Sequence, residues 1–155
     1  MDIRGRRILV IGGAGLIGSH VVEELLKEDI KEVIVYDNFC RGTNENLQKA
    51  LRDPRCRIYE IGGDILQTDI LNAAMEGVDG VIHLAALWLL QCHEYPRAAF
   101  DVNIRGTFNV LEACVANHIK RFSRHADRRA DLSIRQGAVR RGFMGFPLFQ
   151  GPAQW

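Results

Sequence analysis

The sequence lacks several features that point to common classes of protein. None of its four cysteines forms a C-x-x-C pair, and no histidine spacing completes a zinc site. We therefore expect reduced thiols, no metal and a cytoplasmic location. No apolar run approaches the roughly 18 residues that a membrane span requires. A net charge of +1 gives no global field that favours nucleic acid or a membrane as a partner.

Lysine and tyrosine are missing from the last part of the chain. No tyrosine follows Tyr95 and no lysine follows Lys120, whereas residues 121–155 contain seven arginines and two aspartates. Residues 1–120 hold 13 basic and 17 acidic side chains. A charge break this sharp predicts a boundary, and we place it after Phe122.

Strand and helix patterns alternate up to this boundary. The mostly apolar segments 8–11, 33–36, 57–60 and 80–83 predict four strands of a buried sheet. Helical spacing occurs near 17–28, 43–51, 68–75 and 98–117. This alternation requires right-handed crossovers and a parallel sheet. We predict an α/β protein with an incomplete Rossmann-type, doubly wound sheet over residues 1–122. In the irregular, Arg-rich tail at 123–155 no buried strand is drawn.

A glycine-rich loop separates the first predicted strand from the first helix. Gly12, Gly15 and Gly18 form a G-x-x-G-x-x-G pattern in this position. Such a loop favours a dinucleotide, because Gly12 permits the tight turn, Gly15 admits the pyrophosphate and Gly18 lets helix and strand pack closely. The following helix N-terminus attracts the phosphates. The alternative is a structural glycine loop in an unrelated α/β protein.

Asp37 ends the second predicted strand, 19 residues after Gly18. A carboxylate there accepts hydrogen bonds from the adenosine ribose and repels a 2′-phosphate, which favours NAD over NADP. The charge of Arg41 weakens this preference, since it would partly neutralise a 2′-phosphate. The alternative is a strand-end residue that starts a turn with Asn38.

Two further segments fall where the rest of a dinucleotide would lie. Asp64 closes a Gly-Gly-Asp turn, where it would bind an adenine amino group or serve only as a turn. The small residues of 84–86, at the carboxyl end of a strand, suit a flat ligand. We expect His83 to be packed in the sheet rather than catalytic. Asn103 lies inside a helix, where its amide needs a polar partner unless it is exposed.

These residues together resemble one enzyme family over residues 7–122. The matching segments are VIGGAGLIGSHVVEELL, VIVYDNFCRGTNENL, IGGDI, GVIHLAAL and YPRAAFDVNIRGTFNVLEACVANHIKRF. They resemble the extended short-chain dehydrogenase/reductases, within them the NAD-dependent epimerase/dehydratase group that acts on nucleotide sugars, in particular enzymes like UDP-glucose 4-epimerase.

The resemblance implies NAD as cofactor and a role for each matching position. The pyrophosphate would meet Gly12, Gly15, Leu16 and Ile17. The adenosine ribose would be surrounded by Asp37, Asn38 and Gly42, and the adenine by Asp64 and Ile65. Leu84, Ala85 and Ala86 would line the nicotinamide ribose, and Asn103 matches the asparagine of the family's helix. The sequence departs from the family pattern at Ile11, where Thr is frequent, and at Trp88, where some epimerases have a polar cofactor contact.

The family's catalytic residues are not found in this sequence. The resemblance implies a fifth strand after Lys120-Arg121-Phe122, then a Ser/Thr pair and a Tyr-x-x-x-Lys motif, and the absence of later tyrosine and lysine excludes that motif. We assign no catalytic residue and expect an NAD-binding fragment, inactive as written, whose intact relatives act on a nucleotide sugar and pair as homodimers. The tail then reflects a shifted reading frame or a natural truncation, and is expected to be disordered. The alternative is a non-catalytic nucleotide-binding or interaction module.

Overall fold

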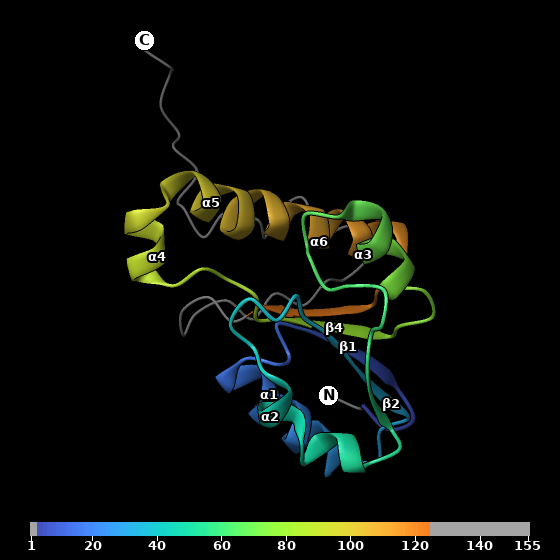
Figure 1. Ribbon diagram of the computed structural model, residues 1–155. Helices are drawn as coiled ribbons and strands as arrows, with labels where there is room; N and C mark the ends of the chain where they lie inside the picture. Colours follow the sequence, from blue (N-terminus) through green and yellow to red (C-terminus); the bar gives the residue numbers. More distant parts are fainter. Residues whose placement is uncertain (1–2, 125–155) are drawn as a thin grey trace, which may run out of the picture.

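Five parallel strands form one sheet in the order β3-β2-β1-β4-β5 in the computed structural model, which describes residues 3–124 (Figure 1). The strands are β1 (Arg7–Ile11), β2 (Glu32–Tyr36), β3 (Cys56–Ile58), β4 (Gly80–His83) and β5 (Arg121–Arg124). The helices are α1 (Leu16–Leu26), α2 (Asn44–Leu47), α3 (Thr68–Ala74), α4 (Leu89–Glu94), α5 (Pro96–Phe100) and α6 (Thr107–Ala116), with a 3-10 turn η1 (Ala50–Arg52) and a π-helical segment η2 (Asp101–Gly106). The predicted Rossmann-type α/β fold is confirmed.

The strand order reverses direction at β1. The chain runs outward from β1 through β2 to β3, then crosses to the other side of β1 for β4 and β5. The loops after β1 and β4 therefore leave the sheet toward opposite faces. In an open parallel sheet, this switch point at the carboxyl ends of the strands is where a ligand binds.

The alternation of side chains along the strands divides the core into two layers. Ile8 and Val10 of β1 pack with Val22 of α1 on one face. Leu9 and Ile11 point to the opposite face, toward the side covered by α3 and α6. Figure 1 shows α1 and α2 on one side of the sheet and α3, α5 and α6 on the other. A sheet covered on both faces explains the apolar runs of the central strands.

The structure corrects two of the predicted elements. A fifth strand is present, and it pairs in parallel with β4, so the expectation of four strands and none after Phe122 is wrong. The long helix predicted at 98–117 begins earlier, at Pro96, and contains the π-helical segment in its middle. Of the predicted tail, Ser123 and Arg124 belong to β5, and the remainder lies outside the described residues.

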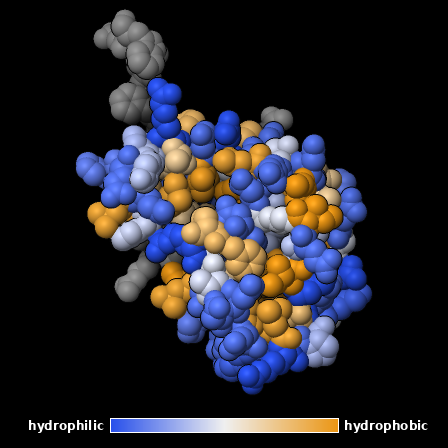
Figure 2. All heavy atoms as spheres, in the orientation of Figure 1, coloured by the Kyte–Doolittle hydropathy of each residue, from blue (hydrophilic) through white to orange (hydrophobic). Residues whose placement is uncertain are grey.

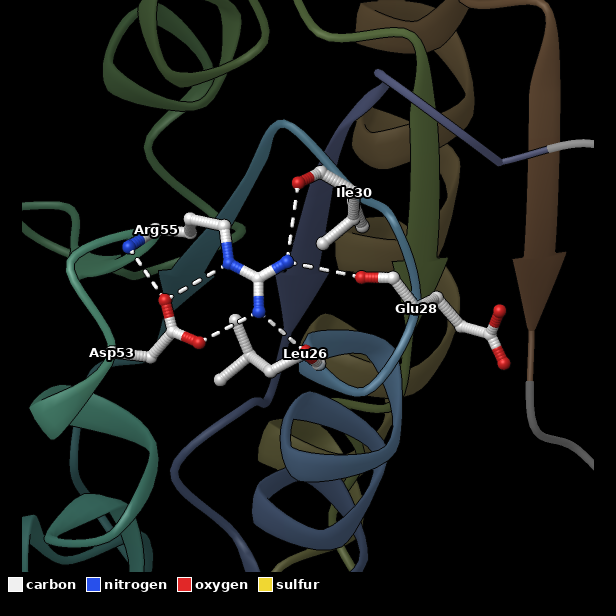
Figure 3. Close-up of polar contacts among 5 residues, drawn as sticks. All are labelled: Leu26, Glu28, Ile30, Asp53 and Arg55. Carbon is white, nitrogen blue, oxygen red and sulfur yellow. Dashed lines mark hydrogen bonds and ion pairs between the residues drawn. The ribbon is translucent and has the colours of Figure 1, made fainter.

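One arginine fastens the end of α1 to the segment that precedes β3 (Figure 3). The guanidinium of Arg55 donates to the carbonyl oxygens of Leu26, Glu28 and Ile30. The carboxylate of Asp53 accepts from the Arg55 Nε at 3.0 Å and from its Nη2 at 2.7 Å. Carbonyl groups at the end of a helix have no partner within the helix, and this cluster supplies one.

Candidate functional site: a cleft at the switch point

The G-x-x-G-x-x-G pattern, which runs from the loop after β1 into α1, makes close backbone contacts at two of its three glycines. Gly12 has a φ of +79°, which favours glycine, and a Cβ there would lie 2.6 Å from the backbone N of Ala85. A Cβ at Gly18 would lie 2.1 Å from the carbonyl oxygen of Gly12. At Gly15 the nearest atom would be 3.4 Å away, so the loop is open there. The helix begins after Gly15 without a side-chain cap, which leaves N–H groups for an anion.

Asp37, directly after β2, has its carboxylate hydrogen bonded to two backbone segments. Its Oδ2 accepts from the N–H of Ala14 at 2.9 Å, and its Oδ1 accepts from the N–H of Phe39 at 2.8 Å. The first bond joins the glycine loop to the end of β2, and the second closes a turn. Since each carboxylate oxygen has two lone pairs, Asp37 retains acceptor capacity for ribose hydroxyls. A turn role and a ribose role are therefore compatible.

Asp64 lies near Asp37 because Gly63 packs on the Asp37 backbone. A Cβ at Gly63 would lie 2.1 Å from the carbonyl carbon of Asp37. The Asp64 Oδ1 accepts from the N–H of Leu66 at 2.9 Å, and the Asp64 carbonyl accepts from the hydroxyl of Tyr36 at 2.9 Å. The predicted turn is confirmed, and it is fixed against the end of β2.

The segment after β4 is held by the side chain of Asn103. The Asn103 Oδ1 accepts from the N–H of Leu87 at 2.7 Å, and its Nδ2 donates to the Leu87 carbonyl at 3.0 Å. Asn103 belongs to η2, and π-helical segments are frequent at functional sites. The alternative of an exposed helix residue is wrong, because Asn103 is half-buried with partners on both polar atoms.

These segments enclose a cleft of about 510 Å³ at the carboxyl ends of β1, β2 and β4. Every predicted cofactor residue except Asn103 lines it, namely Gly12, Gly15, Leu16, Ile17, Gly18, Asp37, Asn38, Gly42, Asp64, Ile65, Leu84, Ala85 and Ala86. Asn103 does not line the cleft. It holds Leu87, which does.

The cleft also contains residues that the sequence did not assign to it. They are Cys40, Arg41, Asn46, Gly63, Leu87 and Val102. The Asn46 amide donates to the carbonyl of Ala14 at 2.8 Å and so supports the glycine loop. No spacing pattern connects Asn46 to that loop. The sequence indicates only the charge of Arg41, whereas in the structure its guanidinium carbon lies 4.9 Å from the ring centroid of Trp88.

His83 is a packed residue of β4, as predicted. It is 1% exposed, and its Nε2 lies 3.1 Å from the Thr107 hydroxyl. That hydroxyl donates to the Asn103 carbonyl at 2.8 Å, so His83 is the donor in the first bond and carries its proton on Nε2. Burial, followed by the charge of Arg124, lowers the pKa of His83 to about 3. The ring is neutral and enclosed, which suits a structural role.

Residues 3–124 hold neither a metal cluster nor a helix that could cross a membrane. No cluster of three or more histidine, cysteine or acidic side chains in this range is arranged to hold a metal ion. None of its helices has both the length and the hydropathy that crossing a membrane requires. Cys56 and Cys114 are buried free thiols, whereas Cys40 is exposed beside the cleft.

Curated relatives match the part of the chain that builds this cleft. UDP-glucuronic acid decarboxylase 3 of Arabidopsis thaliana is 36% identical over 106 residues, covering 68% of this chain and 29% of the relative. UDP-glucose 4-epimerase of Rickettsia bellii is 34% identical over 119 residues, covering 74% of this chain and 34% of the relative. The chain thus spans about a third of the length of the curated relatives that it matches.

Solved structures of similar proteins share the fold of this chain. DesIV, a dTDP-glucose 4,6-dehydratase from Streptomyces venezuelae solved with NAD bound, has a TM-score of 0.70 and 34% identity over 75% of this chain and 38% of its own. UDP-glucose 4-epimerase from Stenotrophomonas maltophila, also with NAD bound, has a TM-score of 0.70 and 27% identity over 77% of this chain and 36% of its own. The 3-beta hydroxysteroid dehydrogenase/isomerase family matches residues 9–123. The chain belongs to that family, and with it to the extended short-chain dehydrogenase/reductases that include the nucleotide-sugar epimerases and dehydratases.

Proposed function

We propose that this chain binds NAD in the cleft at the switch point. The observation that carries the proposal is that four separate segments line one cleft. They are the open side of the loop at Gly15, the carboxylate of Asp37, the turn at Asp64 and the small residues after β4. This order matches the pyrophosphate, ribose, adenine and nicotinamide ends of a dinucleotide lying across the strand ends. Asp37 favours NAD over NADP.

For the full-length relatives, we propose hydride transfer with a nucleotide sugar as the reaction that a cofactor in this cleft serves. Bound in the cleft, NAD would supply a hydride acceptor for the carbon that bears a sugar hydroxyl, the step that precedes epimerisation or dehydration. The relatives support a nucleotide sugar as the substrate class, since their names carry UDP-glucose, UDP-glucuronic acid and dTDP-glucose. In this chain, the cleft residues would bind and orient the cofactor.

We further propose that the 155-residue chain binds NAD without turning over a sugar. No tyrosine follows Tyr95 and no lysine follows Lys120, so a Tyr-x-x-x-Lys acid/base pair cannot form within the chain. Incubation with NAD and UDP-glucose, UDP-glucuronic acid or dTDP-glucose is expected to yield neither NADH nor a modified sugar. Cofactor-dependent product from the purified chain would refute this proposal.

Calorimetry with NAD tests the binding proposal. Asp37→Ala removes the proposed ribose acceptor and a bond to the glycine loop, so we expect affinity to fall about 10- to 100-fold, the worth of hydrogen bonds to a charged group. Asp29→Ala removes an exposed carboxylate away from the cleft and serves as the control. Equal affinities of the wild type and Asp37→Ala would contradict the ribose assignment. Preference for a mononucleotide over NAD would favour the non-catalytic nucleotide-binding module instead.

We propose a homodimer as the assembly, formed through the long helix. Phe100 is 60% exposed, Ile104 54% and Val115 51%. The first two are one helical step of four residues apart, which places them on one face. Figure 2 shows apolar side chains at the surface where α5 and α6 run. Light scattering should show a dimer for the wild type and a monomer for a Phe100→Glu/Ile104→Glu variant, and a monomeric wild type would overturn the proposal.

A further inference from the structure

Arg41 is the one cation among the side chains that line the cleft, all of which lie within the described residues. The other charged lining residues are the carboxylates Asp37 and Asp64. Within residues 3–124, the Arg41 guanidinium makes no ion pair or hydrogen bond, and its contact is with the Trp88 ring, whose centroid lies 4.9 Å away. A guanidinium has five N–H donors, and because Arg41 is exposed these donors face solvent, where an external acceptor can reach them.

The two residues come from loops on opposite sides of the glycine loop. Arg41 follows β2, and Trp88 follows β4 as the residue before α4. Because β1 lies between β2 and β4 in the sheet, a contact between these loops spans the end of β1. There the cleft is lined by the loop that contains Gly12 and Gly15. Arg41 and the first residues of α1, Leu16 and Ile17, thus line the same cleft.

We propose that Arg41, held on the face of Trp88, binds the pyrophosphate of the dinucleotide; this inference rests on the proposed function. A pyrophosphate diester carries two negative charges, and the N-terminus of a helix supplies only about half a positive charge. The carboxylates of Asp37 and Asp64 add to the negative charge in the cleft. Arg41 provides the missing full positive charge.

The contact with Trp88 is compatible with phosphate binding. A planar guanidinium stacks on an aromatic ring through its face and donates hydrogen bonds through its edge, so both interactions occur together. The indole restricts the long arginine side chain before the ligand arrives. Trp88 is therefore a positioning residue, whereas Arg41 contacts the ligand.

Three ligands separate binding to the pyrophosphate from binding to the rest of the molecule. NAD and ADP-ribose contain the pyrophosphate, and adenosine lacks it. We expect Arg41→Gln to weaken NAD and ADP-ribose about 10- to 100-fold by calorimetry, the range for charge-assisted hydrogen bonds. Adenosine, followed by ligand-observed NMR, should change less than about twofold because it makes no charged contact with Arg41.

Variants of Trp88 test the positioning role. Trp88→Leu removes the aromatic face and should weaken NAD about threefold, the size of an exposed cation–π contact. Trp88→Phe keeps an aromatic face and should restore most of that loss. In the Trp88→Leu background, Arg41→Gln should have a smaller effect than in the wild type, because the two side chains act as one unit.

The outcomes distinguish this inference from the proposed function. If the wild type binds neither NAD nor ADP-ribose, the proposed function fails and the inference with it. If the wild type binds both and Arg41→Gln binds both equally well, only the inference is overturned. An equal loss for adenosine would overturn the inference and assign Arg41 to the nucleoside. Unchanged thermal unfolding of Arg41→Gln would exclude misfolding as the cause of weaker binding.

Discussion

The side-chain amide of Asn103 pairs with both backbone polar groups of Leu87, at 2.7 Å to the N–H and 3.0 Å to the carbonyl oxygen. Asn103 lies in the π-helical segment, and Leu87 lines the cleft. The same carbonyl accepts from the Cys92 thiol at 3.3 Å. A helix residue thereby fixes a wall of the proposed nicotinamide end without touching the cleft itself.

Asn103→Ala should therefore loosen that wall. The substitution leaves the half-buried N–H of Leu87 without its partner and leaves the Leu87 carbonyl with only the weak thiol donor of Cys92, so we expect the free energy of unfolding to fall by about 1–3 kcal/mol. The Leu87 amide should exchange its hydrogen faster, and NAD should bind more weakly. Urea denaturation, hydrogen exchange and calorimetry measure these effects. Asn44→Ala, at an exposed position, is the control, and unchanged exchange at Leu87 would contradict the assignment.

Gly15 and Gly18 should respond in opposite ways to the same added methyl group. At Gly18 a Cβ would lie 2.1 Å from a backbone oxygen, so Gly18→Ala should destabilise the fold by about 1–3 kcal/mol or more. At Gly15 the nearest atom is 3.4 Å away and φ is −70°, so Gly15→Ala should keep its thermal stability. Its methyl group would instead occupy the space proposed for the pyrophosphate, and NAD binding should be lost.

Each variant of this pair is the control for the other. Thermal unfolding reports the packing effect, and calorimetry of the folded protein reports the ligand effect. If Gly15→Ala binds NAD as tightly as the wild type, the pyrophosphate does not pass beside Gly15.

The strands that are buried on both faces of the sheet are the ones that the sequence predicts best. β1 and β2 are predicted well because both faces are covered, which requires an uninterrupted apolar run such as Ile8–Ile11. β5 was missed because Phe122 is its one buried residue, flanked by arginines and a serine. A single apolar residue gives no pattern to recognise. The sequence becomes rich in arginine at this point, which does not favour a buried strand. The strand forms nevertheless, because its backbone pairs with β4.

The site was predictable where its residues follow from position along the chain. A glycine loop between strand and helix, and a carboxylate at the end of the next strand, identify Gly12, Gly15 and Asp37 by spacing alone. The contact of Arg41 with Trp88 depends on how two loops distant in sequence meet in space. The π-helical segment was also not predicted, because its apolar spacing does not distinguish it from an α-helix; within it Gly106 packs closely against Ile65.

Acid should weaken the cluster of Asp53 and Arg55 at low pH. Hydrogen bonds from the side chain and backbone of Arg55 lower the pKa of Asp53 to about 2. Because this folded-state pKa lies below the ordinary value near 3.9, the contribution of Asp53 to stability is present above about pH 4 and is lost as the pH falls toward 2. Asp53→Asn should lower the urea midpoint at pH 7 and flatten its decline between about pH 4 and 2. Glu94→Gln, an exposed control, should retain the wild-type decline.

His83 should also make the protein less stable as the pH falls, and this loss should begin at a higher pH than the loss due to Asp53. The pKa of this buried imidazole is lowered to about 3, whereas in the unfolded chain it is near 6.5. Between these values the unfolded state binds a proton that the folded state excludes, so the stability contributed by neutral His83 is complete above about pH 6.5 and declines as the pH falls toward 3. The limiting slope of the free energy of unfolding is about 1.4 kcal/mol per pH unit.

His83→Gln removes this proton uptake, so urea denaturation at pH 7.5 and 5.5 should show a smaller loss of stability than in the wild type. His93→Gln removes an exposed imidazole and should leave the wild-type loss unchanged. Parallel pH profiles for wild type and His83→Gln would show that His83 becomes charged within the folded protein, contrary to its enclosure against Thr107 and Phe122.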